Sequence, residues 1–410
     1  MEMVRRLTWR ELDHEGHMAN RALTKAKNAK KDEFYTQLPE IQAEVNAYLD
    51  YDPDVFRGKT VLLPCDDPEW SNFTRFFAQN FERFGLKKLI STSYAPASKS
   101  RKYGTLFAYA SEQSDETPQN ERGKIFVLDH DTNANGRIDF DDLEWHYLRG
   151  DGDFRSDEVR RLRDEADIIV TNPPFSLFRE FLTWIVEAGK KFLIIGNINC
   201  VSYKEAFPLI KANRLWLGES IHSGDREFGV PKDYPLEAAG WRVDEKGNHF
   251  IRVKGVRWFT NLEHGQRHKP LDLMTMERNL KFLPHKDFHD KLGYRQYDNY
   301  EAIEIPYTDT IPSDYSGVMG VPITFLDKYC PAQFEILGIT KTWFGGANKI
   351  YPEQIEIDKK GKRKRVTKLN DGAALQIDKP PVGETYYIVG DRLYQQAYAR
   401  ILIRKRKDVE

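Results

Sequence analysis

Short apolar runs alternate with segments of helical periodicity between about residues 32 and 218. The apolar runs have the composition of β-strands: "KTVLLPC", "KKLISTSY", "GKIFVLDH", "DIIVTN" and "KFLIIGNIN". The segments between them have the spacing of amphipathic helices: "SNFTRFFAQNFERFG", "EVRRLRDEA" and "FREFLTWIVEAG". Strands that alternate with helices predict a parallel sheet covered by helices on both faces, a doubly wound α/β domain. In such sheets, ligands bind at the carboxyl ends of the strands.

The pattern changes after about residue 262, where Pro, Tyr and short β-like runs replace the helical periodicity. A chain of 410 residues is long enough for two domains. We therefore expect a basic N-terminal arm at 1–32, an α/β domain at 33–262 with an insertion at about 95–150, and a β-rich region at 263–410.

Cysteine usage and hydropathy restrict the setting of the protein. Cys65, Cys200 and Cys330 lie far apart, which excludes a disulfide framework and a closely spaced zinc cluster. The sequence contains no apolar run of about 18 residues and no signal-peptide pattern near Met1. We expect a cytoplasmic protein that does not enter a membrane. The formal net charge of −1 does not exclude an anionic partner, because positive charge is concentrated locally.

A stiff junction follows the strand expected at "DIIVTN", in the residues Asn172, Pro173, Pro174 and Phe175. Two consecutive prolines can continue neither the strand nor the helix that follows. The Asn172 side-chain oxygen and the Pro173 carbonyl can accept both hydrogens of one planar amino group, and Phe175 can stack on a flat ring. These groups suit the exocyclic amine of a nucleobase that faces an electrophile. The structural alternative is a rigid loop with a buried Phe.

The junction resembles the (Asp/Asn)-Pro-Pro-(Tyr/Phe) motif of S-adenosylmethionine-dependent amino-methyltransferases. Collinear segments between about residues 25 and 340 resemble the EcoRI-type adenine DNA methyltransferases: "KNAKKDEFYTQ", "PCDDPEWSNF", "GDGDFRS", "VRWFTNLEH", "YDNYEAIEI" and "GVMGVPITFLDKY". The resemblance implies a Rossmann-like methyltransferase sheet with a C-terminal recognition region. It also implies methyl transfer from S-adenosylmethionine to N6 of an adenine that is flipped out of duplex DNA.

The same resemblance implies a biological setting and partners. We expect a role in restriction-modification or DNA protection, with double-stranded DNA as the partner. A cognate restriction endonuclease would be a functional rather than a physical partner, and we expect the protein to be a monomer.

The resemblance also assigns roles to site residues. Asn172 and Pro173 would orient the target amine, Pro174 would fix the turn, and Phe175 would stack on the flipped adenine. The residues implied to contact the cofactor are Phe34, Tyr35, Thr36, Pro64, Cys65, Asp66, Asp67, Ser93, Asp153, Phe154 and Asn172. Here the chain departs from the general pattern, because the first strand is not followed by Gly-x-Gly and the second strand does not end in an acid. A helix cap by an Asp or by Ser71 is the structural alternative at 66–71.

A second pattern lies in "DTNANGRIDFDD", which matches the spacing of a calcium-binding loop. Its candidate ligands are Asp131, Asn133, Asn135, Asp139 and Asp142. The strand expected just before it argues against a helix-loop-helix, and a tight turn is the alternative. Such a site would be structural, since amine methylation by this chemistry needs no metal.

Basic tracts in the C-terminal half suggest contacts with DNA phosphates. The candidates are Lys362, Arg363, Lys364, Arg365, Arg404 and Lys405. A solvated hairpin is the alternative for any one of these runs. Two other functions remain open: an amino-methyltransferase that acts on RNA or on a protein glutamine, and a catalytically decayed DNA-binding protein.

Overall fold

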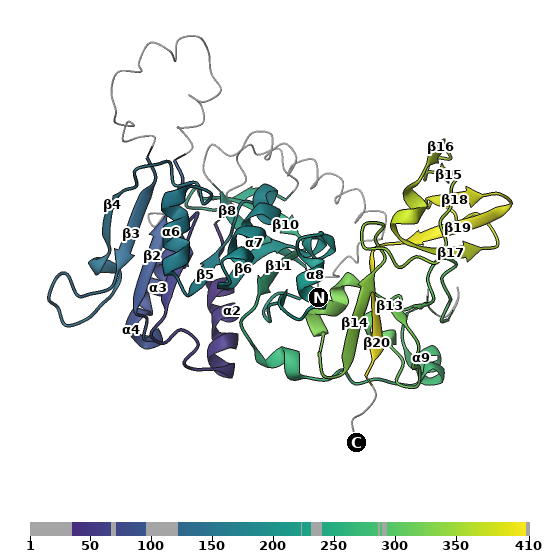
Figure 1. Ribbon diagram of the computed structural model, residues 1–410, viewed down its shortest axis with the longest axis horizontal. Coiled ribbons are helices and arrows are strands. Elements are labelled where there is room, and N and C mark those ends of the chain that lie inside the picture. Colours follow the sequence, from purple (N-terminus) through teal and green to yellow (C-terminus); the bar gives the residue numbers. More distant parts are fainter. Residues whose placement is uncertain are drawn as a thin grey trace, which may run out of the picture. The chain divides into compact units, whose positions relative to one another are not determined.

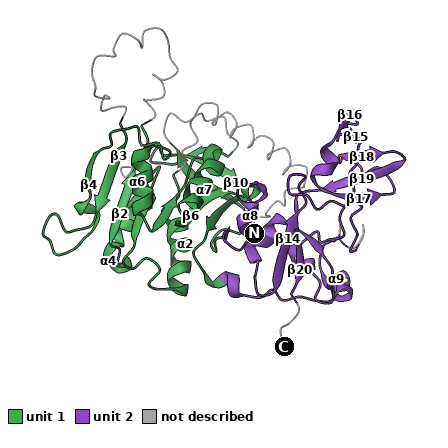
Figure 2. Cartoon of the chain, in the orientation of Figure 1, with its two compact units in different colours: residues 1–200, 217–265 green, residues 201–216, 266–410 purple. Residues whose placement is uncertain are grey.

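The computed structural model describes residues 35–66, 71–95, 122–222, 224–230, 240–285, 288 and 293–406. The expected N-terminal arm at 1–32 lies outside the described residues, as do the site candidates Phe34 and Asp67. The chain forms two compact units, one of residues 1–200 and 217–265 and the other of residues 201–216 and 266–410 (Figure 2).

An eight-stranded sheet forms the centre of the first unit (Figure 1). Its strands, in spatial order, are β4 (Glu144–Tyr147), β3 (Lys124–Leu128), β2 (Lys88–Thr92), β1 (Thr60–Leu63), β5 (Ile168–Thr171), β6 (Lys191–Asn197), β11 (Val256–Thr260) and β7 (Trp216–Leu217).

The four strands β2, β1, β5 and β6 run parallel, as the sequence predicts. Strands β3, β4 and β11 are antiparallel to their neighbours, so the sheet as a whole is mixed, whereas the sequence predicted a parallel sheet. The apolar pattern of a strand does not encode its direction, which depends on how the connection before it returns the chain. Every residue of β1 and β5 is buried, and this burial explains their continuous apolar runs.

Among the described residues, the α-helices of the first unit are α2 (Leu38–Tyr51), α3 (Asn72–Gln79), α4 (Phe81–Phe84), α6 (Asp157–Glu165) and α7 (Phe178–Glu187). Helix α3 buries Phe73, Phe76 and Phe77 in the main hydrophobic core. Ser71 begins this helix, and its side chain accepts hydrogen bonds from the N–H groups of Phe73 and Thr74. The single helix expected over "SNFTRFFAQNFERFG" is divided into α3 and α4, and Gly85 ends α4 in the left-handed conformation.

A smaller three-stranded sheet also belongs to the first unit. Its order is β8 (Asp225–Val230), β10 (His249–Lys254) and β9 (Arg242–Val243). Phe228 of β8 is fully buried and belongs to the same core as α3. The chain just before α2 also pairs with β8, through Tyr35 and Gly229.

The second unit is rich in β-structure, as the sequence predicts. One sheet has the order β12 (Ile303–Glu304), β13 (Met319–Pro322), β20 (Arg400–Lys405) and β14 (Phe334–Ile339), and the other has the order β16 (Arg363–Val366), β15 (Gln354–Ile357), β18 (Tyr386–Val389), β19 (Arg392–Ala397) and β17 (Ala373–Ile377). Its α-helices among the described residues are α8 (Phe207–Lys211) and α9 (Met276–Phe282).

Short 3₁₀ helices complete the described elements of both units: η3 (Phe140–Asp142), η4 (Phe175–Leu177), η5 (Ile198–Ser202), η6 (Gly265–His268), η7 (Thr308–Thr310), η8 (Ile323–Lys328) and η9 (Lys368–Asp371).

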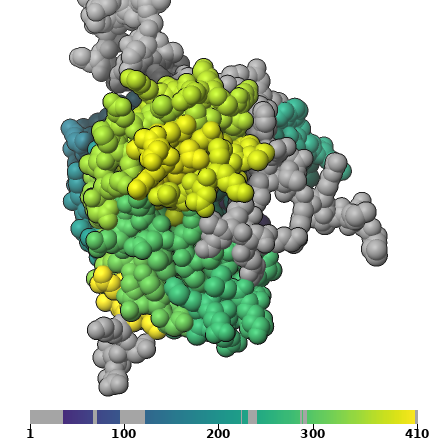
Figure 3. Space-filling view, turned by 90° about the vertical axis from the view of Figure 1, so that its right-hand side faces the viewer, coloured from purple at the N-terminus to yellow at the C-terminus, as the bar shows by residue number. Residues whose placement is uncertain are grey.

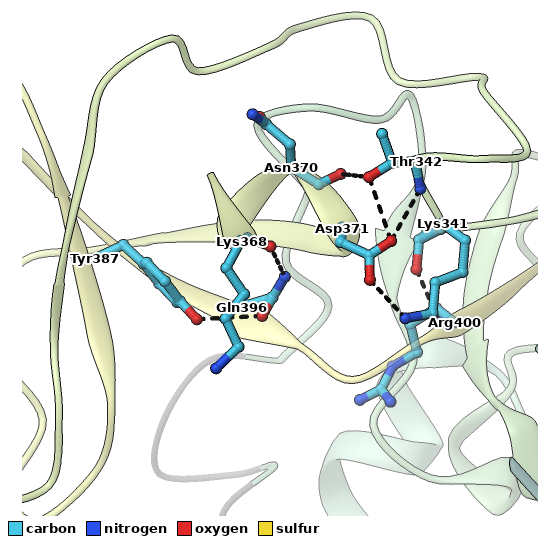
Figure 4. Close-up of polar contacts among 9 residues, drawn as sticks. Lys341, Thr342, Lys368, Asn370, Asp371, Tyr387, Gln396 and Arg400 are labelled. Carbon is cyan, nitrogen blue, oxygen red and sulfur yellow. Dashed lines mark hydrogen bonds and ion pairs between the residues drawn. The ribbon is translucent and has the colours of Figure 1, made fainter. Parts of the chain in front are cut away.

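A polar cluster links the two sheets of the second unit (Figure 4). The carboxylate of Asp371, at the end of η9, binds Lys341 Nζ at 2.8 Å and the N–H of Thr342 at 3.1 Å. The Thr342 hydroxyl donates to the carbonyl of Asn370 at 3.0 Å. Lys341 follows β14 and Asp371 precedes β17, so these bonds connect the two sheets.

Candidate active site

The Asn-Pro-Pro-Phe junction lies at the carboxyl end of β5, as expected. Strand β5 ends at Thr171, and η4 begins at Phe175 and leads into α7. Asn172 is half-buried, and its side-chain oxygen Oδ1 has almost no solvent-accessible surface. Pro173 is buried, and the carbonyl of Pro174 accepts the N–H of Leu177 at 2.9 Å. The two prolines thus separate the strand from the 3₁₀ turn.

Phe175 is half-buried rather than enclosed in the core. Its ring centroid lies 6.4 Å from that of Phe228, with the two rings nearly perpendicular. The ring is therefore supported from one side by β8 while part of its surface is open to solvent.

The turn after β1 contains the expected residues Pro64, Cys65 and Asp66. Cys65 has a φ of 68°, in the left-handed region that normally favours glycine. The Asp66 N–H donates to the Thr92 carbonyl at 2.9 Å, and the Ser91 hydroxyl donates to the Asp66 carbonyl at 2.6 Å. The turn therefore forms without the Gly-x-Gly sequence, because Cys65 adopts the left-handed conformation.

The Asp66 side chain is buried and joins the ends of β1 and β5. Its Oδ1 accepts the Ser71 hydroxyl at 2.8 Å, and its Oδ2 lies 2.5 Å from Thr171 Oγ1. Ser71, rather than an Asp, is the N-cap of α3. Thr171 was not among the sequence candidates, although its position directly before Asn172 marks it in retrospect.

The segment of Tyr35 and Thr36 contacts α3, the helix that follows this turn. The Asn72 side chain, in the first turn of α3, donates to the Thr36 carbonyl at 2.8 Å. The Thr36 hydroxyl is buried and has no hydrogen-bond partner among the described residues. A buried hydroxyl of this kind ordinarily bonds to protein, water or a ligand. Thr36 therefore fits a site for a polar ligand, and Asn72 is a residue that sequence reasoning missed.

Three further cofactor candidates, Ser93, Asp153 and Phe154, lie near the carboxyl end of β2. Ser93 Oγ accepts the N–H of Lys124 at 3.0 Å, and the Ser93 carbonyl lies so close to Gly152 that a Cβ there would meet it at 2.0 Å. This close approach, together with a φ of 79°, requires glycine at position 152. It brings Asp153 next to the end of β2.

The side chains of Asp153 and Phe154 have further contacts. Arg155 donates two bonds to the Asp153 carboxylate, at 2.7 and 2.9 Å, and this contact raises the pKa of Arg155. The buried Phe154 ring packs against Phe181 and Trp184 of α7, at centroid distances of 5.0 and 5.6 Å.

In the calcium-like loop, carboxylates accept hydrogen bonds from backbone N–H groups of the same loop. Asp142 accepts the N–H groups of Asp139, Thr132 and Asn133, and these bonds lower its pKa. Asp131 accepts the N–H groups of Asn135 and Gly136. Within the described ranges, no group of three or more His, Cys, Asp or Glu side chains is arranged to hold a metal ion.

The basic candidates fall on two different sheets of the second unit. Lys362, Arg363, Lys364 and Arg365 are exposed and lie in or beside β16, the edge strand of the five-stranded sheet. In Figure 3, the yellow-green to yellow residues in the upper part of the view include those of this sheet. Arg404 is exposed on β20 of the other sheet, whereas Lys405 donates to the Ser313 carbonyl at 3.1 Å.

Comparison with known proteins bears on this arrangement. The model of the family described as "Adenine-specific methyltransferase EcoRI" matches residues 22–406. The chain is 42% identical over 328 residues to the type II methyltransferase M.EcoRI of Escherichia coli, covering 78% of this chain and 90% of that protein. It is 35% identical over 316 residues to the type II methyltransferase M.MpnI of Mycoplasma pneumoniae, covering 76% and 84% of the two chains. No solved structure matches significantly.

None of the helices that the structure describes is both long and apolar enough to cross a membrane. The family match covers most of the chain and confirms the resemblance that the sequence motifs indicate. The protein belongs to the EcoRI family of adenine-specific methyltransferases.

Proposed function

We propose that this adenine-specific DNA methyltransferase transfers a methyl group to N6 of an adenine turned out of the duplex, at the corner formed by Asn172, Pro173 and Phe175. The observation that carries the proposal is the position of this corner. It lies at the carboxyl end of β5, directly beside the turn that follows β1. Ligands of open α/β sheets bind at such an edge, at the point where the connections that follow two neighbouring strands lead in opposite directions.

The sheet order supports a Rossmann-like methyltransferase fold. The parallel strands β2 and β5 flank β1 on its two sides, and β11 lies antiparallel beside β6. We infer that the cofactor site is the edge formed by the ends of β1, β2 and β5.

S-adenosylmethionine, when bound there, supplies an electrophilic methyl group on a sulfonium. The residues that we propose to hold it are Tyr35, Thr36, residues 64–66 and Asp153. The buried Thr36 hydroxyl fits a polar group of the cofactor, and Asp66 adds negative charge beside a positively charged ligand. Ser93 and Phe154 remain candidates of the second rank, because one bonds to β3 and the other packs on α7.

The residues of the corner prepare the amine without a strong base. The Asn172 Oδ1 and the Pro173 carbonyl each accept one N–H hydrogen of the adenine amine, so the nitrogen lone pair turns away from the ring. The Phe175 ring stacks on the extruded base and replaces the stacking that the base loses in the duplex. Most of the rate gain then comes from positioning and from the exclusion of water.

The second unit is the proposed recognition region. Its exposed cations at 362–365, with Arg404, supply charge for phosphate contacts. The names of the type II relatives suggest a restriction-modification setting, with a cognate endonuclease acting on the same sites. We infer a monomer that works in the cytoplasm, where its DNA substrate is accessible.

The decisive experiment compares the wild type, Asn172→Ala and Asn172→Asp for transfer of labelled methyl groups to duplex DNA, RNA and protein. We expect N6-methyladenine in duplex DNA from the wild type. Asn172→Ala should lower turnover by about 10²-fold or more, while calorimetry finds cofactor binding nearly unchanged. Asn172→Asp keeps an acceptor oxygen in the place of the Asn172 Oδ1 and should retain more activity. Near-normal turnover of Asn172→Ala would show that the amine is held elsewhere, and label in RNA or glutamine would change the substrate.

A further inference from the structure

A buried hydroxyl connects the last residue of β5 to the turn that follows β1. Thr171 is fully buried, and its Oγ1 lies 2.5 Å from Asp66 Oδ2 and 2.6 Å from the Pro64 carbonyl. The next residue along the chain is Asn172. The residue with this hydroxyl thus directly precedes the proposed amine clamp, which consists of the Asn172 Oδ1 and the Pro173 carbonyl.

Backbone pairing cannot make this connection. The register between β1 and β5 ends at Leu62 and Ile169. Pro64 has no N–H to extend the ladder, although its carbonyl is still available. The Thr171 side chain therefore replaces the missing backbone bond at the point where the two strands separate.

The same connection continues to the neighbouring elements. Asp66 Oδ1 accepts the hydroxyl of Ser71, the N-cap of α3. The Asp66 carbonyl accepts the hydroxyl of Ser91 on β2, and that hydroxyl lies 2.8 Å from Thr74 Oγ1. All five residues of this hydroxyl network are buried: Asp66, Ser71, Thr74, Ser91 and Thr171. Hydrogen bonds in such a dry network reinforce one another, so the turn is held rigidly.

We propose that Thr171 is a positioning residue for methyl transfer. Its hydroxyl hydrogen, shared between Asp66 Oδ2 and the Pro64 carbonyl, fixes Asn172 relative to the turn at residues 64–66. The inference rests on the proposed function. It adds that the clamp for the amine and the turn that holds the methyl donor are connected by this hydroxyl. A displacement of about 1 Å at a reacting centre costs on the order of 10² in rate, so the connection affects turnover.

The test compares Thr171→Val, which replaces the hydroxyl by a methyl group of similar size, with Thr171→Ser, which keeps the hydroxyl. Thr171→Val should lower kcat by about 10- to 100-fold and change the cofactor dissociation constant by less than about threefold, since Asp66 stays in place. Thr171→Ser should restore kcat to within about threefold of the wild type. A role in folding alone would lower the melting temperature without this split between kcat and binding.

Thr183→Val is the matched control, because it removes a hydroxyl that donates only to the Arg179 carbonyl within α7. It should leave kcat unchanged. Asp66→Ala breaks the same connection from the other side, so its effect on kcat and that of Thr171→Val should not add in the double variant. If Thr171→Val does not fold, Thr171→Ala, which also removes the hydroxyl, should lower kcat at least tenfold while Thr171→Ser stays active.

Two outcomes would overturn the inference: an unchanged kcat in Thr171→Val, or an equal loss in Thr171→Ser and Thr171→Val. A wild type that places no methyl group on adenine would instead overturn the proposed function. The two failures are therefore distinguishable in one series of assays.

Discussion

Tyr35 and Gly229 exchange both of their backbone hydrogen bonds, at 2.9 and 3.0 Å. Through this pair, the segment before α2 forms an antiparallel β-bridge with β8. The same strand contains Phe228, whose ring contacts the Phe175 ring. One short strand thus supports two parts of the proposed site, the cofactor segment at Tyr35 and the ring that would stack on the base.

Replacement of Gly229 by proline removes the N–H that donates to Tyr35. We expect Gly229→Pro to weaken cofactor binding about 5- to 10-fold, because one hydrogen bond contributes about 1 kcal/mol. Gly229→Ala keeps the N–H, and its Cβ would lie 3.4 Å from Tyr35 Cβ, so this control should bind normally. Calorimetry measures both constants, and equal affinities in the two variants would contradict the role of this bridge.

Truncation of Phe175 should mainly weaken capture of the extruded base. We expect Phe175→Ala to need about 5- to 150-fold more protein to reach half of the fluorescence increase of a 2-aminopurine target, because stacking on an aromatic ring contributes about 1–3 kcal/mol per base. Cofactor affinity should change little. Phe175→Tyr preserves the ring and serves as the control. If Phe175→Ala reached half of the increase at the same protein concentration as the wild type, the stacking would be assigned to another side chain.

The left-handed backbone at Cys65 leads to a prediction about stability. Cys65→Gly should leave the melting temperature equal or higher, since relief of about 1–2 kcal/mol of backbone strain offsets the entropy cost of glycine. Cys65→Val should lower it, because a β-branched residue fits this conformation poorly. Cys65→Ala separates the backbone effect from the loss of sulfur. Thermal unfolding decides, and a fully stable Cys65→Val would argue against the strained turn.

Neutralising the exposed cations of the β15–β16 hairpin should reduce the salt dependence of DNA binding. With Lys362, Arg363, Lys364 and Arg365 all changed to Gln, the slope of log affinity against log salt should become shallower by about 0.9 for each DNA phosphate that is no longer neutralised. Arg160→Gln with Arg161→Gln, on exposed positions of α6, gives a matched control. An unchanged slope in the hairpin variant would place the phosphate contacts on other residues.

Asp371 predicts a pH-dependent stability of the second unit. Burial raises the pKa of Asp371, but the bonds from Lys341 and the Thr342 N–H lower it by more than burial raises it. The net pKa therefore lies below the ordinary value of 3.8. A carboxyl with a lowered pKa stabilises the fold above its unfolded value, and this contribution is lost as the pH falls through the folded pKa. Asp371→Asn should therefore be less stable at pH 7, by less than about 1 kcal/mol for so exposed a pair. The difference should shrink as the pH falls below 3.8 and vanish once the pH is below the lower pKa of the folded state. Urea unfolding at several pH values measures it, and a difference that persists in acid would contradict the cause.

The sequence alone predicted the five apolar runs that become β1, β2, β3, β5 and β6 and the helical segments that become α3, α4, α6 and α7, and it located the junction at Asn172. Continuous apolar runs predict buried strands because both faces of a central sheet are covered, and two prolines must break the chain wherever they lie. The motifs also led to the correct family, since their order along the chain is specific.

Only the tertiary structure decided how the turns are made and what holds them. The direction of β3 and β11 depends on the path of the connections, which local periodicity does not record. Cys65 replaces a glycine because the surrounding bonds from Ser91 and to Thr92 enforce its left-handed conformation. Thr171 and Asp66 are 105 positions apart in the sequence, so their hydrogen bond exists only once β1 and β5 lie side by side.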